Sequence, residues 1–369
     1  GSASSYVSGN ITDSGSIALS AGQLTLGGNS SYSGKTWIHG GELIVDGDIS
    51  SSAELIIGSY GTLSGSGAVP LVRGSGLLAP GSSPGILTSP ALSPTAGLDF
   101  ALEFTAATSP NFGAPNSSIN DLIRLTNATP FTTALGISST VSIYLNITSI
   151  ENSQQFRGGF FTDSDEDFLA SINEATIKYY IADPSGSLSY NGQTYSEYSG
   201  IYLFTLSTPA QSANFGGGTI NGKILQIKIE PDQSHYEGWK IFHGLSGYDA
   251  LDDADTDFDG IGQLIEFAIG GDPNGNNLGI LPSLSLVEDG GSTYLELTLE
   301  RPVGLQGISY MPKTTTSLTS WPNDSNGIVN PSPQPIDSGN GMEKLVYRRS
   351  QPVSNMGQAF IRVEVGVSP

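Results

Sequence analysis

A tripeptide of the form Gly-x-Leu recurs near the N-terminus at a nearly constant step. It occurs as Gly22-Gln23-Leu24, Gly41-Glu42-Leu43 and Gly61-Thr62-Leu63, 19 and then 20 residues apart, each within a short alternating segment. A β-solenoid needs such a period, because each repeat forms one rung, its Leu or Ile joins an inward stack, and Gly or Asn lies where the backbone turns. We therefore expect a short β-solenoid of about three or four rungs over residues 1–91. An ordinary β-sandwich with glycine turns is the alternative.

Three segments of this region also carry a family resemblance. Residues 24–36 (LTLGGNSSYSGKT) and 40–47 (GGELIVDG) resemble the passenger-associated, or autotransporter-associated, β-strand repeat, and residues 78–87 (LAPGSSPGIL) resemble the usual end of that repeat. The resemblance covers about a quarter of the chain. It implies an exported bacterial β-helical stalk and no associated activity.

The middle of the chain, residues 92–234, alternates apolar and polar positions between polar turns. Segments 99–104 and 141–145 show this alternation, and segment 223–229 places its Ile and Leu side chains on one face. We expect a β-sandwich or jelly-roll-like domain. Within it, residues 167–175 have apolar positions at helical intervals and predict a helical turn.

Residues 235–279 have a different pattern. Apolar residues spaced as on one side of a short helix are Tyr236, Trp239, Ile241, Phe242 and Leu245. We expect this helix to end at Gly247 and to be followed by a dense acidic loop, so that the segment connects two β-domains.

The β pattern returns in residues 280–369, in segments 294–299, 343–348 and 360–365. A region of this length and pattern fits an immunoglobulin-like or fibronectin-like sandwich.

The acidic loop matches a calcium-binding pattern. Residues 255–266 read DTDFDGIGQLIE, with carboxylates at loop positions 1, 3 and 5, Gly at position 6 and Glu at position 12. A hard cation takes about six to eight oxygens, and three Asp crowded together repel one another unless a cation neutralises them. The predicted calcium ligands are Asp255, Asp257, Asp259, Ile261 through its backbone carbonyl, Gln263, directly or through water, and Glu266.

The segments around this loop, 239–247 and 264–273, resemble a C-terminal module of exported proteins from Verrucomicrobia and related bacteria. In that module a β-domain follows and ends in an Arg-containing strand, as at residues 360–365 here. Two positions depart from the module, which usually has Asn at the position of Gln263 and Gly at that of Phe258. The whole chain is thus expected to be all-β, with a short N-terminal β-solenoid, β-sandwich domains and a small helical calcium-loop connector.

A second acidic run is less favourable for a cation. Asp163, Asp165 and Asp167 are spaced as in the first loop, and Glu174 lies at the distance of position 12. Phe168, however, stands where the sharp turn requires Gly. We do not expect a second calcium site there.

Charge and composition narrow the choice of partners. The chain has 14 Lys and Arg against 35 Asp and Glu, a net charge of −21, which opposes binding to nucleic acids and to anionic lipid surfaces. No apolar run approaches the roughly 20 residues that span a bilayer. The chain has no Cys, which excludes disulfides and thiolate ligands. It starts at Gly1 without an initiator Met, as a processed or an engineered N-terminus would.

Two functions fit this sequence. The first is a non-enzymatic structural protein, secreted or at the bacterial cell surface, that self-associates through β-edges. In it, residues 1–12 are a strand donated to a neighbouring copy; the alternatives are a frayed tail or the solenoid's own first rung. The second is a carbohydrate-binding or polysaccharide-active protein, suggested by 15 Tyr and 3 Trp. Catalytic groupings are hard to assemble, because His39, His235 and His243 are the only histidines and none lies in a recognisable motif. A paired-carboxylate hydrolase is still compatible with the many acidic residues.

Overall fold

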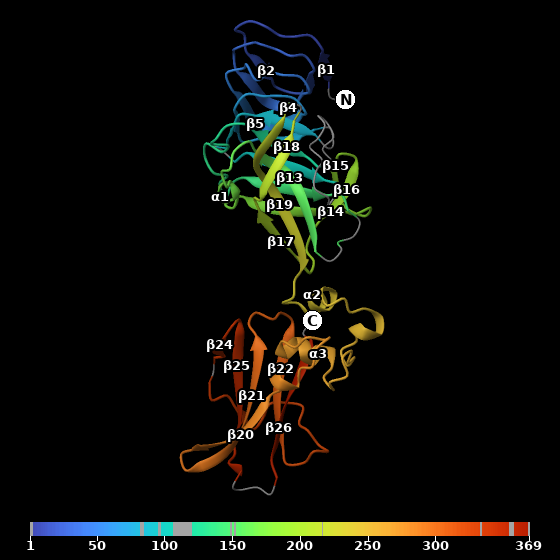
Figure 1. Ribbon diagram of the computed structural model, residues 1–369, viewed down its shortest axis with the longest axis vertical. Coiled ribbons are helices and arrows are strands. Elements are labelled where there is room, and N and C mark those ends of the chain that lie inside the picture. Colours follow the sequence, from blue (N-terminus) through green and yellow to red (C-terminus); the bar gives the residue numbers. More distant parts are fainter. Residues whose placement is uncertain are drawn as a thin grey trace. The chain divides into compact units, whose positions relative to one another are not determined.

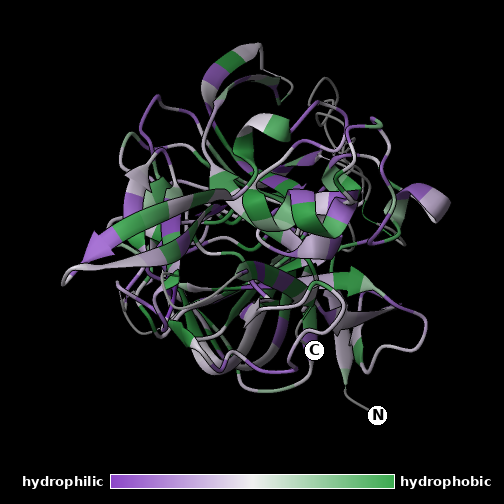
Figure 2. Cartoon of the chain, turned by 90° about the horizontal axis from the view of Figure 1, so that it is seen from below, coloured by the Kyte–Doolittle hydropathy of each residue, from purple (hydrophilic) through white to green (hydrophobic). Residues whose placement is uncertain are grey.

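The computed structural model describes residues 3–81, 85–94, 97–105, 120–147, 150, 153–215, 217–332, 334–353 and 358–367. The chain forms two compact units, Gly1–Glu230 and Pro231–Pro369 (Figure 1). Strands predominate in both, which confirms the expected all-β class. Many strands alternate apolar and polar residues, seen in Figure 2 as colour changes along single ribbons.

The repeats of the first unit form parallel strands stacked in register. Their order in the sheet is β1 (Ser4–Val7), β3 (Gln23–Leu26), β4 (Thr36–Val45), β5 (Leu55–Gly65) and β7 (Leu77–Pro80). Leu24 pairs with Leu43, and Leu43 with Leu63. The Gly-x-Leu period of the sequence is thus the step from one strand to the next.

An inward column of apolar side chains follows from this register. Leu43, Leu63 and Leu78 are fully buried, and Phe100 continues the column in the next strand. Gly22 and Gly41 have φ of 79° and 82°, and a Cβ at Gly41 would lie 2.2 Å from the carbonyl oxygen of Gly22. Only glycine fits that turn, because the neighbouring rung lies too close for any side chain.

The same sheet continues past residue 91. It adds β10 (Asp99–Phe104), β12 (Thr140–Leu145) and β14 (Thr176–Ala182) in parallel, then β16 (Gln193–Glu197) and β15 (Leu188–Tyr190) in antiparallel pairing. Three short strands also pair with this sheet outside its main order. They are β2 (Ile17–Leu19), which pairs with β4, β6 (Val72–Gly74), which pairs with β5, and β9 (Leu92–Ser93), which pairs with β6. The boundary predicted between residues 91 and 92 therefore falls inside a continuous sheet. The finer division into four domains stays a prediction.

A second sheet completes the first unit. It contains β8 (Ile86–Ser89), β11 (Leu122–Leu125), β13 (Gln154–Thr162), β17 (Tyr202–Ser207), β18 (Ala210–Asn214) and β19 (Thr219–Pro231). Phe100 and Phe104 of the first sheet contact Phe160 and Phe156 of the second edge to face, so the sheets share one core. The predicted helical turn exists as α1 (Leu169–Ile172).

The N-terminal segment pairs within its own chain. β1 pairs with β3, with Ser4 opposite Gln23 and Val7 opposite Leu26. Residues 4–7 thus form the first rung of their own sheet, which is one of the roles that the sequence left open for them.

The second unit begins with helices and ends in two sheets. The helices are α2 (Tyr236–Phe242), η1 (Gly247–Ala250), α3 (Gln263–Ile269) and η2 (Leu278–Ile280). One sheet contains β20 (Ser283–Asp289), β21 (Ser292–Pro302), β23 (Ile328–Val329), β24 (Ile336–Gly339) and β25 (Met342–Arg349), and the other contains β22 (Ile308–Thr315) and β26 (Phe360–Val367). Leu297, Leu345 and Ile361 join both sheets in one core with Ile269 of α3.

The first helix of this unit is shorter than expected. It starts at Tyr236 as predicted but ends at Phe242, with His243 as its C-cap. Gly244, at φ 72°, turns the chain out of the helix, and Gly247 instead begins the 3-10 turn η1. The earlier glycine therefore ends the helix, which corrects the expectation that it runs to Gly247.

Candidate metal site

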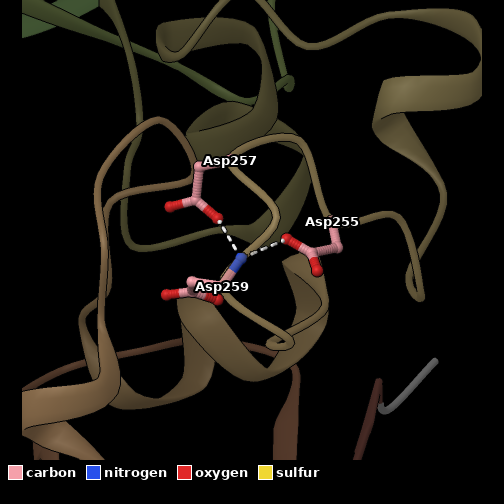
Figure 3. A group of neighbouring side chains, drawn as sticks. All are labelled: Asp255, Asp257 and Asp259. Atoms are coloured by element: carbon pink, nitrogen blue, oxygen red, sulfur yellow. Dashed lines mark hydrogen bonds between the residues drawn. The ribbon is translucent and has the colours of Figure 1, made fainter.

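The three aspartates of the predicted loop lie together between η1 and α3. One carboxylate oxygen from each of Asp255, Asp257 and Asp259 lies within 4.8 Å of the others. Figure 3 shows the three carboxylates around the backbone amide of Asp259. The structure thus brings together loop positions 1, 3 and 5, as the sequence predicted.

Backbone amides hold the loop in shape. The Asp259 amide donates to Asp255 Oδ1 and to Asp257 Oδ1, both at 3.1 Å. The amides of Gly260 and Ile261 donate to Asp255 Oδ2 at 2.9 Å and to Asp259 Oδ1 at 2.9 Å. Gly260 adopts φ 90°, the turn for which position 6 needs glycine. Ile261 is 5% exposed. Its buried side chain holds this part of the loop in place, and with it the backbone carbonyl that is the predicted ligand.

Helix α3 supplies the two remaining predicted ligands. Gln263 and Glu266 lie in its first turn and are 0% and 1% exposed. Three of the predicted ligands each have a buried side-chain oxygen without a hydrogen-bond partner among the described residues: Asp257 Oδ2, Gln263 Oε1 and Glu266 Oε2. A buried acceptor without a partner is costly, and a cation bound by these oxygens removes that cost.

The electrostatics of the loop are unfavourable without a cation. Burial raises the pKa of Glu266 to about 7, and the nearby carboxylates of Asp257 and Asp259 add to this effect. The pKa of Asp257 is also raised, by desolvation first and then by the two neighbouring Asp side chains. The side chains of Asp257, Asp259 and Glu266 offer only carboxylate oxygens as metal ligands, the ligand type preferred by calcium and magnesium.

Two residues that the sequence did not suggest orient the ligands. Asn277 donates from its side chain to Glu266 Oε1 at 2.6 Å, and its backbone amide donates to Asp259 Oδ2 at 2.5 Å. The Thr256 hydroxyl accepts from Gln263 Nε2 at 3.0 Å and donates to the Pro273 carbonyl. The Gln263 amide nitrogen is thereby held on Thr256 while its Oε1 stays unpaired. The turn-forming sequence Gly-Gly-Asp-Pro at 270–273 was the available signal for this return of the chain.

The second acidic run does not form such a cluster. Asp163 makes a bidentate salt bridge to Arg124, at 2.9 and 2.6 Å. Asp167 accepts from the Leu169 amide and from the Thr208 hydroxyl, and so orders the start of α1. Within the described residues, the metal-type grouping of acidic side chains is that of Asp255, Asp257 and Asp259.

The three histidines occupy separate environments. His39 stacks on Trp37 with ring centroids 5.6 Å apart. His235 precedes α2, and His243 ends it, packed on Trp239 with Nδ1 3.7 Å from Asp272 Oδ1. Burial lowers the pKa of His243, an effect that Asp272 partly opposes.

Comparisons with known proteins identify one partial relative. A 69-residue stretch is 45% identical to an extracellular serine protease of Serratia marcescens, and it covers 18% of this chain and 6% of that protein. No family model and no solved structure matches the chain. In the part of the chain that the structure describes, no helix is long and apolar enough to cross a membrane.

Proposed function

We propose that this chain is a non-enzymatic extracellular structural protein of bacteria, a cell-surface stalk or a subunit of a fibre, whose second unit is stabilised by calcium. In this proposal the stacked parallel strands are a β-solenoid, the antiparallel sheets of the second unit are a β-sandwich, and the helical loop is the calcium-bearing connector. The partial similarity to an extracellular protease is consistent with export.

The observation that carries the calcium assignment is the set of unpaired buried oxygens on Asp257, Gln263 and Glu266. They belong to loop positions 3, 9 and 12. The first lies in the acidic loop and the other two lie in α3. At about millimolar free calcium and a dissociation constant of about 10⁻⁴ M, calcium binding would add on the order of 1 to 2 kcal/mol to stability.

Chelation tests this assignment. We expect a chelator to lower the melting temperature of the wild-type protein, and Asp257→Ala or Glu266→Gln to remove the calcium response. Asp165→Ala, in the second acidic run, is the matched control and should keep it. Identical melting curves of the wild type with and without chelator would refute the calcium assignment.

Self-association is proposed to occur at the outer edge of β1. Among the described strands, β1 pairs only with β3, so its other edge is open to strand addition. The carbonyls of Ala3 and Val7 accept from the amides of Gln23 and Gly27, so these residues face β3. Tyr6, one position before Val7, therefore directs its backbone groups to the open edge.

A proline at position 6 tests edge pairing without removing a hydrogen bond between β1 and β3. Tyr6→Pro removes the outward amide, whereas Tyr6→Ala keeps it and serves as the control. We expect electron microscopy of the wild type and of Tyr6→Ala to show assemblies with a regular axial repeat, and Tyr6→Pro to remain dispersed. Equal assembly by all three proteins would exclude the β1 edge.

A further inference from the structure

The outward face of the stacked strands carries a groove of about 410 Å³ in the first unit. Its lining comes from four successive rungs. The residues are Ser4, Gly22, Gln23, Gly41, Glu42, Tyr60 and Thr62. Neither the calcium loop nor the β1 edge pairing requires this surface.

One wall of the groove is a ladder of polar side chains, one from each rung. Ser4 pairs in register with Gln23, Gln23 with Glu42, and Glu42 with Thr62. The Ser4 hydroxyl donates to Gln23 Oε1 at 3.1 Å, and Gln23 Nε2 donates to Glu42 Oε2 at 2.8 Å. The ladder thus offers preorganised donors and acceptors at a repeat of about 4.8 Å, the spacing of adjacent strands.

An aromatic ring stands beside this ladder. Tyr60 is 87% exposed, although it belongs to β5, whose neighbouring apolar residues Ile57 and Leu63 are fully buried. Exposed to this degree, the ring does not contribute to the core. A flat apolar ring next to a row of hydrogen-bonding groups suits a ligand with an apolar face and polar edges.

The charge of the groove selects among such ligands. Glu42 is the one charged residue of the lining, and it is acidic, within a chain of net charge −21. An anionic ligand is therefore repelled. A sugar ring has a face of C–H groups that can stack on a tyrosine and a rim of hydroxyls that both donate and accept.

We propose that this groove binds an uncharged polysaccharide, with Tyr60 as the stacking platform and the Gln23 and Glu42 side chains as hydroxyl partners. The chain of sugars runs along the rungs, because the ladder extends in that direction. This proposal does not rest on calcium binding, since its residues belong to the first unit. It does not rest on assembly either, since Gln23, Glu42 and Tyr60 lie in β3, β4 and β5 and not at the open edge of β1.

Affinity electrophoresis of the full chain tests the proposal, with soluble β-1,3-glucan, mannan, xylan and dextran as neutral probes and polygalacturonate as the acidic probe. We expect at least one neutral polysaccharide to retard the wild-type protein, with or without chelator. Tyr60→Ala should weaken this binding at least tenfold, and Tyr60→Phe, which keeps the ring, should retain it.

Tyr248→Ala is the matched control, because Tyr248 is also 87% exposed but belongs to the second unit. It should bind as the wild type does. The proposal is overturned if no neutral polysaccharide retards the protein, if only polygalacturonate does, or if Tyr60→Ala and Tyr248→Ala behave alike. Loss of binding on chelation would also contradict it, because a site in the first unit has no need of the cation.

Discussion

Phe258, in the candidate metal-binding loop, has a backbone conformation that residues with a side chain rarely adopt. Its φ is 62°, in the left-handed region, and its side chain is 90% exposed. The ring therefore gains little from packing, while the backbone bears a cost of about 1 kcal/mol or more. The module that this segment resembles usually has glycine here, the residue that adopts this conformation without strain.

We expect Phe258→Gly to raise the stability of the calcium-loaded protein by about 0.5 to 1 kcal/mol, since the relieved strain exceeds the entropy that glycine adds to the unfolded chain. Tyr248→Gly is the control, because Tyr248 is equally accessible but has a negative φ, and it should destabilise. Thermal unfolding in calcium measures both. A lower melting temperature for Phe258→Gly would show that the ring is needed where it stands.

Glu266 predicts how the stability of the metal-free protein depends on pH. Its pKa is about 7 in the fold against 4.5 for an unperturbed Glu, so the folded chain holds the proton more tightly than the unfolded chain. The stability that this proton supplies is present below about pH 4.5 and is lost as pH rises to about 7. We expect a loss of about 3 kcal/mol over this range, since a pKa difference of one unit corresponds to about 1.4 kcal/mol.

Urea unfolding in chelator, at pH values from 4.5 to 8, tests this expectation. Glu266→Gln carries no titrating group at this position and should lack that part of the pH dependence. The same pH profile for the variant and the wild type would mean that other groups control the stability.

At the scale of elements, the segment after α3 closes the candidate metal site. Asn277 is not among the predicted ligands, but its side chain holds Glu266 and its amide holds Asp259. We expect Asn277→Ala to weaken calcium binding at least tenfold, because ligands without their outer partners lose orientation. Asn276→Ala, next to it and exposed, should not change the affinity. Calorimetric titration with calcium measures both, and equal affinities would exclude an orienting role for Asn277.

The candidate site was predictable where its ligands are local in the sequence. Asp255, Asp257, Asp259 and Glu266 follow one short pattern, and the turn and helix that join them need no distant contact. Asn277 was missed because its role depends on the chain returning to the loop after α3. The Gly-Gly-Asp-Pro turn at 270–273 signals that return but does not determine which later residue contacts the ligands.

The fold shows the same division between local and distant information. The strand at residues 141–145 and the helical turn at 167–175 are present, because alternation and helical spacing are local signals. The continuity of the first sheet past residue 91 depends on β7 pairing with β10, an interaction set by tertiary register. The role of Ser4–Val7 was left open by the sequence, since an edge strand has the same pattern whether its partner is in its own chain or another.

At the scale of the whole molecule, the two compact units predict two separable effects on unfolding. Leu43 is fully buried in the inward column of the first unit. Leu43→Ala should therefore lower the free energy of unfolding of that unit by about 2 to 5 kcal/mol, and with it the temperature of that unit's transition. Chelation should lower the transition of the second unit. Calorimetry of the wild type and variant, each with and without chelator, tests this. A single transition shifted by both changes would show that the units unfold together.

The register of the stacked strands determines which changes in chain length the first unit can accept. Thr36 lies opposite Leu55, so the loss of residues 36–54 would bring Leu55 into the place of Thr36 and leave every following side chain on its original face. The loss of a single residue within a strand would instead exchange inward and outward side chains as far as the next turn. Insertions and deletions of whole rungs are therefore the ones that preserve the inward and outward faces of this sheet. Natural variants of this unit should differ in length by whole rungs.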